Sequence, residues 1–203
     1  MCGRFLVIID EAELKDIIAS AETSADERLD HLSFTFRGGE IFPSNTAPVI
    51  TADGVRFMTW GFPSIANKKP HINARSETAM TSKTFREAMT TRRCVVPASA
   101  YFEWQMHGAV KKRKTKYEFT LPKREPLYMA GIYTTEGQFA ILTRDAAPAM
   151  TEIHDRMPVI IPKPSIEAWL KKSPEVMGDA LTALQFEPVP ASDKNPNQLR
   201  LFT

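Results

Sequence analysis

The stretch CVVPASAYFEW, residues 94–104, is rich in β-branched and aromatic residues, as expected of a strand that packs into a core. Similar stretches follow it along the chain: YEFTL (117–121), PLYMAGIY (126–133), QFAILT (138–143) and RMPVII (156–161). Before it, APVIT (47–51) and VRFMTW (55–60) flank the turn signal Ala52-Asp53-Gly54, which predicts a hairpin. The middle of the chain is therefore predicted to form mainly β-sheet.

Helices are predicted mainly outside this region. Asp10 and Glu13 form a capping-box pattern, and apolar residues then recur at helical spacing, which predicts a helix over 11–22. Further helices are predicted over 82–91, over 165–171 and after Ser173, which is followed by proline. Because the strands run together while the helices are segregated, we expect an α+β fold. Its sheet should be mostly antiparallel and curved or barrel-like, with flanking helices.

The composition fits one globular domain. The chain has 203 residues, of which 43% are hydrophobic and 25% charged, which is enough for a sizeable core. We therefore expect a single domain over 1–203. The polar, proline-rich stretch from Pro188 to Thr203 is expected to be a C-terminal tail, either extended over the domain or frayed.

Charge and cysteine content exclude several classes of protein. The net charge is only +2, so any attraction to nucleic acid must come from local clusters of basic residues. Two cysteines, Cys2 and Cys94, cannot form a disulfide framework, and no apolar run at the start resembles a signal peptide or a membrane span. Four scattered histidines without zinc-type spacing predict neither a metal site nor a cofactor. A cytoplasmic protein with free thiols is expected.

The chain opens with MCGRF, which places a cysteine directly behind the initiator methionine. Removal of Met1, which a small second residue normally allows, would leave a thiol and a free α-amine together on Cys2. Such an amine condenses with an aldehyde to a Schiff base, and the neighbouring thiol can then close a five-membered thiazolidine ring. The alternative is that Cys2 is a small buried residue at the start of a strand.

Three further motifs place polar residues where plain strands would carry apolar ones. HINARSET (71–78) contains Asn73 and Arg75, and IHDRMPVII (153–161) opens with a histidine and an arginine before an apolar strand. FEW (102–104) sets Glu103 between two large aromatic residues, where desolvation is expected to raise the pKa of the carboxyl group.

In their order along the chain, MCGRF, HINARSET, RRCVVPASAYFEW (92–104) and IHDRMPVI resemble the SRAP family, the SOS-response-associated peptidases or abasic-site processing proteins. The resemblance covers nearly the whole chain. It implies a β-rich domain that binds single-stranded DNA and captures the aldehyde of an abasic site as a thiazolidine on an exposed Cys2. It also implies self-catalysed removal of Met1, weak abasic-site lyase activity and a role in the response to DNA damage.

The resemblance extends to single residues. The implied catalytic residues are Cys2, Asn73, Glu103 and His154, and the implied DNA-binding residues are Arg4, Arg75, Trp104, Thr143 and Arg156. In this assignment Asn73 holds the reacting centre and Glu103 moves protons of the incoming amine. His154 acts as a second proton carrier that assists opening of the sugar ring.

Each of these residues also has a purely structural interpretation. Glu103 could pair with an arginine, His154 could cap a helix or loop, and Asn73 could satisfy its own turn. The arginines could be ordinary surface charges. The basic run KKRKTK (111–116) could be a solvated hairpin end or an electrostatic arm for the phosphate backbone.

Two stretches depart from the family pattern. Several relatives carry a tryptophan pair after the Trp-Gly turn, where this chain reads GFPSIAN (61–67), which leaves recognition of duplex ends open. Many relatives have an asparagine-containing turn where this chain reads GGEIFPSN (38–45), so either Glu40 or Asn45 could take that role.

Two other functions remain compatible with the sequence. An amidohydrolase of the N-terminal nucleophile type would use Cys2 to attack a side-chain amide, with its own amine as the base. A non-covalent single-strand binder would use Cys2 only for packing. The expected partner is single-stranded DNA that contains abasic sites, bound by a monomer that is nucleoid-associated when on DNA and has no membrane partner.

Overall fold

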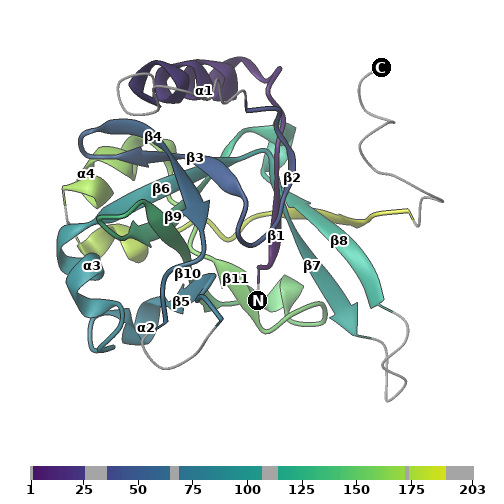
Figure 1. Ribbon diagram of the computed structural model, residues 1–203. Helices are drawn as coiled ribbons and strands as arrows, with labels where there is room; N and C mark the ends of the chain where they lie inside the picture. The colour runs from purple at the N-terminus through teal and green to yellow at the C-terminus, as the bar shows by residue number, and fades with distance from the viewer. Residues whose placement is uncertain (1, 26–35, 65–68, 107–113, 172–173, 191–203) are drawn as a thin grey trace.

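The computed structural model describes residues 2–25, 36–64, 69–106, 114–171 and 174–190, and two β-sheets dominate them (Figure 1). The first sheet contains β1 (Arg4–Val7), β2 (Gly39–Ile41), β7 (Ala100–Met106), β8 (Lys114–Thr120) and β12 (Gln185–Pro188). Its strand order is β12-β8-β7-β1-β2, and every pairing in it is antiparallel. The strand that follows Cys2 therefore lies inside a sheet, between β7 and β2.

The second sheet closes on itself. It contains β3 (Thr46–Thr51), β4 (Gly54–Trp60), β6 (Arg93–Ala98), β9 (Leu127–Tyr133), β10 (Gln138–Asp145) and β11 (Arg156–Pro158). The order is β11-β10-β4-β3-β6-β9, and β9 also pairs with β10, which completes a ring. Only β4 and the short β5 (Asn73–Arg75) pair with β10 in parallel. The predicted α+β fold with a mostly antiparallel, barrel-like sheet is confirmed.

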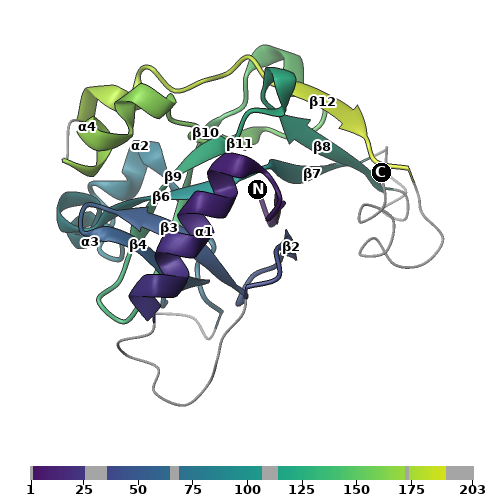
Figure 2. The ribbon, with the colours of Figure 1, turned by 90° about the horizontal axis from the view of Figure 1, so that it is seen from above.

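Helices cover the closed sheet. The helices are α1 (Ala12–Ala25), α2 (Ser76–Ala79), α3 (Arg86–Thr91) and α4 (Ile166–Leu170), and the short 3₁₀ turns are η1 (Pro122–Arg124), η2 (Pro148–Met150), η3 (Lys163–Ser165) and η4 (Pro174–Met177). Helix α1 crosses β3 and β4, while β7, β8 and β12 extend away from the closed sheet (Figure 2). Among the described residues, none of these helices combines the length and the apolar character that a membrane span requires.

The predicted elements differ from the observed ones mainly at their ends. The hairpin is confirmed as β3 and β4, and the first helix is confirmed but runs on to Ala25. The helix predicted over 82–91 begins only at Arg86, because Ser82 first forms a turn in which its hydroxyl accepts a hydrogen bond from the Thr84 amide. Pro188 is the last residue of β12, and the rest of the predicted tail from residue 191 lies outside the described residues.

Aromatic packing and hydrogen bonds fix the start of β1 and the start of β5. Phe5 and Trp60 are fully buried and pack edge to face, with ring centroids 5.0 Å apart. The indole Nε1 of Trp60 donates to the carbonyl of Ile72, 2.8 Å away, directly before β5. Cys2, which precedes Phe5, and Asn73, which follows Ile72, are thereby held where the two sheets meet.

Candidate active site

Cys2 lies immediately before β1 and is joined to the second sheet by Asn73. The Nδ2 atom of Asn73, the first residue of β5, donates a hydrogen bond of 2.7 Å to the carbonyl of Cys2. The thiol of Cys2 donates to the carbonyl of Arg4 at 3.6 Å. The Oδ1 atom of Asn73 is buried and has no hydrogen-bond partner among the described residues. It can therefore accept a hydrogen bond from a bound group.

The thiol of Cys2 is fully buried in the chain that carries Met1. Desolvation by burial raises its pKa, and the nearby carboxylate of Glu103 raises it further. The exposed Cys2 that the resemblance implies concerns the form without Met1 and stays a prediction, whereas the form with Met1 keeps the thiol enclosed. Met1 precedes Cys2 in the sequence, so the nitrogen of Cys2 is also an amide here and not an amine.

Glu103 projects from β7 with only 3% of its surface exposed. Desolvation by burial raises the pKa of its carboxyl group to about 7, which is the direction that the FEW motif predicted. A carboxyl group with such a pKa can take up or release a proton near neutral pH.

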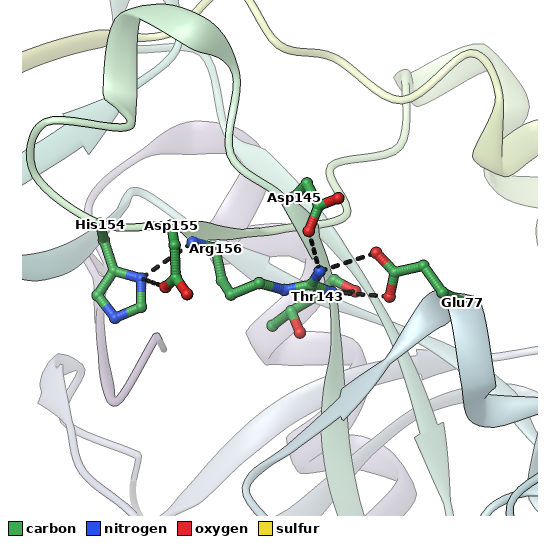
Figure 3. Close-up of polar contacts among 6 residues, drawn as sticks. All are labelled: Glu77, Thr143, Asp145, His154, Asp155 and Arg156. Carbon is green, nitrogen blue, oxygen red and sulfur yellow. Dashed lines mark hydrogen bonds and ion pairs between the residues drawn. The ribbon is translucent and has the colours of Figure 1, made fainter.

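His154 lies between η2 and β11, with its Nε2 atom 4.0 Å from Oε2 of Glu103. Desolvation by burial lowers the pKa of the imidazole, which favours its neutral form at neutral pH. On the other side of the ring, Nδ1 lies 2.8 Å from Oδ1 of Asp155 and 3.0 Å from the backbone nitrogen of Arg156 (Figure 3). Glu103 and His154 thus form a candidate acid–base pair.

Arg156 is buried in a cluster of carboxylates (Figure 3). Its two terminal nitrogens donate to the carboxylate of Glu77 at 2.8 Å each, and one of them also donates to the carbonyl of Thr143 at 2.8 Å. Asp145 accepts a further hydrogen bond. Arg156 therefore joins β11 to β10 and α2, and binding of a phosphate would have to displace one of its carboxylate partners. Its role in DNA binding stays a prediction.

The other predicted DNA-binding residues differ in how accessible they are. Arg75, the last residue of β5, is exposed and has no ion pair with any residue that the structure describes. Thr143 is almost completely buried, and its hydroxyl oxygen lacks a hydrogen-bond partner within the described ranges. Arg75 is thus the predicted residue best placed to meet a phosphate group.

Arg4 and Trp104 belong to a cluster of cations and aromatic rings on the first sheet. The guanidinium of Arg4 lies 4.1 Å from the ring centroid of Phe42 and 4.9 Å from that of Trp104. Arg4 also donates to Glu40 at 3.3 Å, and Lys116 forms a second ion pair with the same carboxylate. We call these five residues the Arg4 cluster. It presents positive charge beside aromatic faces, of which that of Phe42 is exposed.

Sequence reasoning named Arg4, Trp104, Glu40 and the basic run that ends at Lys116, but it did not bring them together and did not single out Phe42. Glu40 meets both Arg4 and Lys116 because β2, β1, β7 and β8 are neighbours in the sheet, which no local pattern reveals. The structure places both residues that could take the role of the family's asparagine: Glu40 joins the cluster, and Asn45 accepts a hydrogen bond from the backbone of Phe42 within a turn. Residues 111–113 of KKRKTK and residues 65–67 of GFPSIAN lie outside the described residues.

The four motifs thus meet at one junction, and comparison with known proteins identifies their family. The family described as SOS response associated peptidase (SRAP) matches residues 1–196. The chain belongs to the SRAP family. The resemblance seen in the sequence is therefore confirmed.

Individual SRAP relatives are distant in sequence but match most of the chain. Abasic site processing protein YobE of Bacillus subtilis (strain 168) is 31% identical over 193 residues, which cover 84% of this chain and 82% of the relative. Abasic site processing protein YoqW of the same strain is 32% identical over 193 residues, with 84% and 80% covered. The crystal structure of a protein from Bacteroides thetaiotaomicron superposes with a TM-score of 0.70 at 22% identity, over 94% of this chain and 93% of that chain, and shares the fold.

Proposed function

We propose that this protein captures abasic sites in single-stranded DNA through a covalent bond to Cys2. The observation that carries the proposal is the hydrogen bond from Asn73 to Cys2 at the junction where Glu103 and His154 form an acid–base pair. The relatives named as abasic site processing proteins support the same activity. The protein would act as a monomer, and its location would follow that of damaged DNA.

The proposed reaction needs an amino-terminal Cys2. Hydrolysis of the peptide bond between Met1 and Cys2, catalysed by the protein itself, supplies the α-amine. This amine adds to C1′ of the ring-opened sugar, and loss of water gives the Schiff base. The thiol then adds to the imine carbon while its proton passes to the imine nitrogen, which closes the thiazolidine ring.

Glu103 and His154 would move the protons in this sequence. Glu103, with a pKa of about 7, takes a proton from the attacking amine and returns one to the departing water. His154 protonates the ring oxygen of the sugar as it opens. When the Schiff base persists without attack by sulfur, β-elimination breaks the strand, so the proposal includes weak lyase activity.

Positive charge and aromatic surface would hold the DNA strand. Arg75 supplies an exposed guanidinium for a phosphate, and the Arg4 cluster supplies the faces of Phe42 and Trp104 for unstacked bases. Because Cys2 is buried, the proposal requires that loss of Met1 or binding of DNA expose the thiol.

The test is denaturing electrophoresis of the protein after incubation with a single-stranded oligonucleotide that carries one abasic site. A slow band is expected with the wild type and with Cys94→Ala, which removes the other buried thiol, but not with Cys2→Ala. Capping the aldehyde with methoxyamine should also remove the band. A wild-type protein that lacks Met1 by intact mass and still gives no band would contradict the proposal.

The same preparations distinguish the other two functions. An amidohydrolase would release ammonia from glutamine in the absence of DNA. A non-covalent binder would give equal shifts with wild type and Cys2→Ala on a native gel and no band on the denaturing gel.

A further inference from the structure

The Nδ1 atom of His154 faces two partners with opposite requirements (Figure 3). The backbone N–H of Arg156 donates to Nδ1 at 3.0 Å, which requires a lone pair on that nitrogen. The Oδ1 atom of Asp155 lies 2.8 Å from the same nitrogen, and a carboxylate can only accept, so this contact is favourable only when Nδ1 carries a proton. One nitrogen cannot meet both requirements at once, so His154 has two alternative hydrogen-bonding arrangements.

The two partners differ in their freedom to move. The side chain of Arg156 is only 9% exposed and is held by Glu77 and Asp145, so its backbone N–H stays in place. The side chain of Asp155 is 87% exposed and can turn toward the imidazole or away from it. The orientation of Asp155 is therefore the variable that decides between the two arrangements.

We propose that Asp155 is a positioning residue that selects which nitrogen of His154 carries the proton; its part in capture rests on the function proposed above. With Asp155 turned away, the N–H of Arg156 fixes the neutral imidazole with its proton on Nε2, which points toward Glu103. With Asp155 turned in, the proton sits on Nδ1 and is donated to the carboxylate. The Nε2 atom then becomes an acceptor.

The second arrangement prepares His154 to receive a proton. Nε2 can take a proton from the carboxyl group of Glu103 or from a group bound between the two side chains. The charge of the donor then falls by one unit. The resulting imidazolium keeps its Nδ1 proton on Asp155, whose carboxylate balances the new positive charge. Return of the proton restores the starting state, so no proton is gained or lost over the cycle.

Among the described residues, the charges that face His154 come from β7 and from its own segment. Glu103 faces it from β7, and Asp155 faces it from its own segment, while the guanidinium of Arg156 is paired with Glu77 and Asp145. Desolvation by burial and the positive charge of the amino terminus lower the pKa of His154, and the carboxylate of Asp155 raises it. Removing that carboxylate should therefore lower the pKa of His154 further.

The first experiment is an NMR titration of His154 in the protein without DNA, in which long-range ¹H–¹⁵N correlations report the tautomer. Asp155→Asn removes the charge, and Asp155→Ala also removes the acceptor. Both variants should show a lower pKa for His154 and a larger share of the form protonated on Nε2. The control is Glu152→Gln, which removes an exposed carboxylate from the same loop and should change neither quantity. Wild-type values in both Asp155 variants would overturn the proposal.

The second experiment measures the rate of crosslinking between pH 6 and pH 8. Asp155→Asn should slow the reaction by about two- to fivefold, the range for an ion pair with one exposed partner, and should shift the pH profile to lower pH. A shifted pKa with an unchanged profile would overturn the role of Asp155 in capture. A wild type that never crosslinks, with His154 still responding to Asp155, would contradict the proposed function alone.

Discussion

Single residues of the candidate site are buried at different costs to stability. Glu103 and Cys2 both carry ionisable groups that are 3% or less exposed, and burial disfavours the charged form of each. A neutral thiol packs like a small apolar residue, so the burial of Cys2 costs little. The carboxyl group of Glu103 is polar in either form, so its burial is the one that lowers stability.

Replacement of Glu103 by glutamine should stabilise the protein at alkaline pH. The pKa of this carboxyl group rises from 4.5 in the unfolded chain to about 7 in the folded protein. The folded state therefore binds the extra proton between these values, and wild-type stability falls as the pH rises through that window. Glu103→Gln should lack this loss and be more stable than wild type at pH 8 by about 1–3 kcal/mol.

Urea unfolding at pH 5 and at pH 8 checks this prediction. The difference between variant and wild type should be larger at pH 8. Glu125→Gln, which changes an exposed glutamate, should unfold like the wild type at both pH values. Equal effects of Glu103→Gln at the two pH values would show that the carboxyl group does not titrate in this range.

The sequence predicted the raised pKa of Glu103 in its direction but not in its cause. Phe102 and Trp104 point to the opposite face of β7, toward Lys116 and Arg4, so other segments bury the carboxyl group. The surroundings of Arg156 were not predictable, since Glu77 and Asp145 reach it from α2 and β10. The burial of Cys2 in the form with Met1 also depends on distant segments, among them Asn73 of β5.

At the level of elements, β1 is fixed by a serine in the turn between β6 and β7. The backbone N–H of Ile8 donates to the hydroxyl of Ser99 at 2.9 Å, and this hydroxyl donates to Glu11 at 3.0 Å. The backbone N–H of Ser99 donates to the carbonyl of Leu6 at 2.8 Å. The strand that follows Cys2 is thereby held in register with β7.

Ser99→Ala should destabilise the protein by about 1–3 kcal/mol, because it leaves the N–H of Ile8 without its acceptor in a largely buried place. The loss should be visible as a lower midpoint of urea unfolding. Ser20→Ala on the exposed face of α1 removes a hydroxyl that bonds only to its own helix and should change the midpoint little. Equal midpoints for Ser99→Ala and wild type would show that the hydroxyl does not anchor β1.

A helix or strand could be predicted from the sequence when the residues that determine it lie within the element itself. The β3–β4 hairpin follows from its own alternating residues and its Asp-Gly turn, and it was placed almost to the residue. The strand β5 has three residues and exists because Asn73, Ala74 and Arg75 pair with β10 in parallel. The edge strand β12 similarly depends on β8. Such strands have no periodic signal of their own.

For the molecule as a whole, binding of DNA must rely on local charge. The net charge of +2 offers little long-range attraction, so salt should weaken binding only through the few basic groups that touch phosphates. Arg75 is exposed at the junction of the two sheets and is the best candidate for such a contact.

Arg75→Gln should reduce the dependence of binding on salt. Each phosphate contact on a single strand contributes about 0.7 to the slope of log K against log salt, so the slope should fall by about 0.7. Fluorescence anisotropy with a labelled oligonucleotide at several salt concentrations measures it. Arg56→Gln, which changes a half-exposed arginine paired with Asp53 on the β3–β4 hairpin, should keep the wild-type slope. An unchanged slope in Arg75→Gln would exclude a phosphate contact by this residue.

The pairing of β1 with β7 also bears on when Met1 can be removed. Arg4 is paired with Phe102, so the partner of the first strand is synthesised long after it. At 5–20 residues per second, the ribosome needs roughly 5–20 s to reach that partner. During this interval β2 is the only described strand of the sheet that the beginning of the nascent chain can pair with. Glu103 lies on β7 itself, so self-catalysed removal of Met1, as proposed above, can begin only after β7 has emerged and paired with β1.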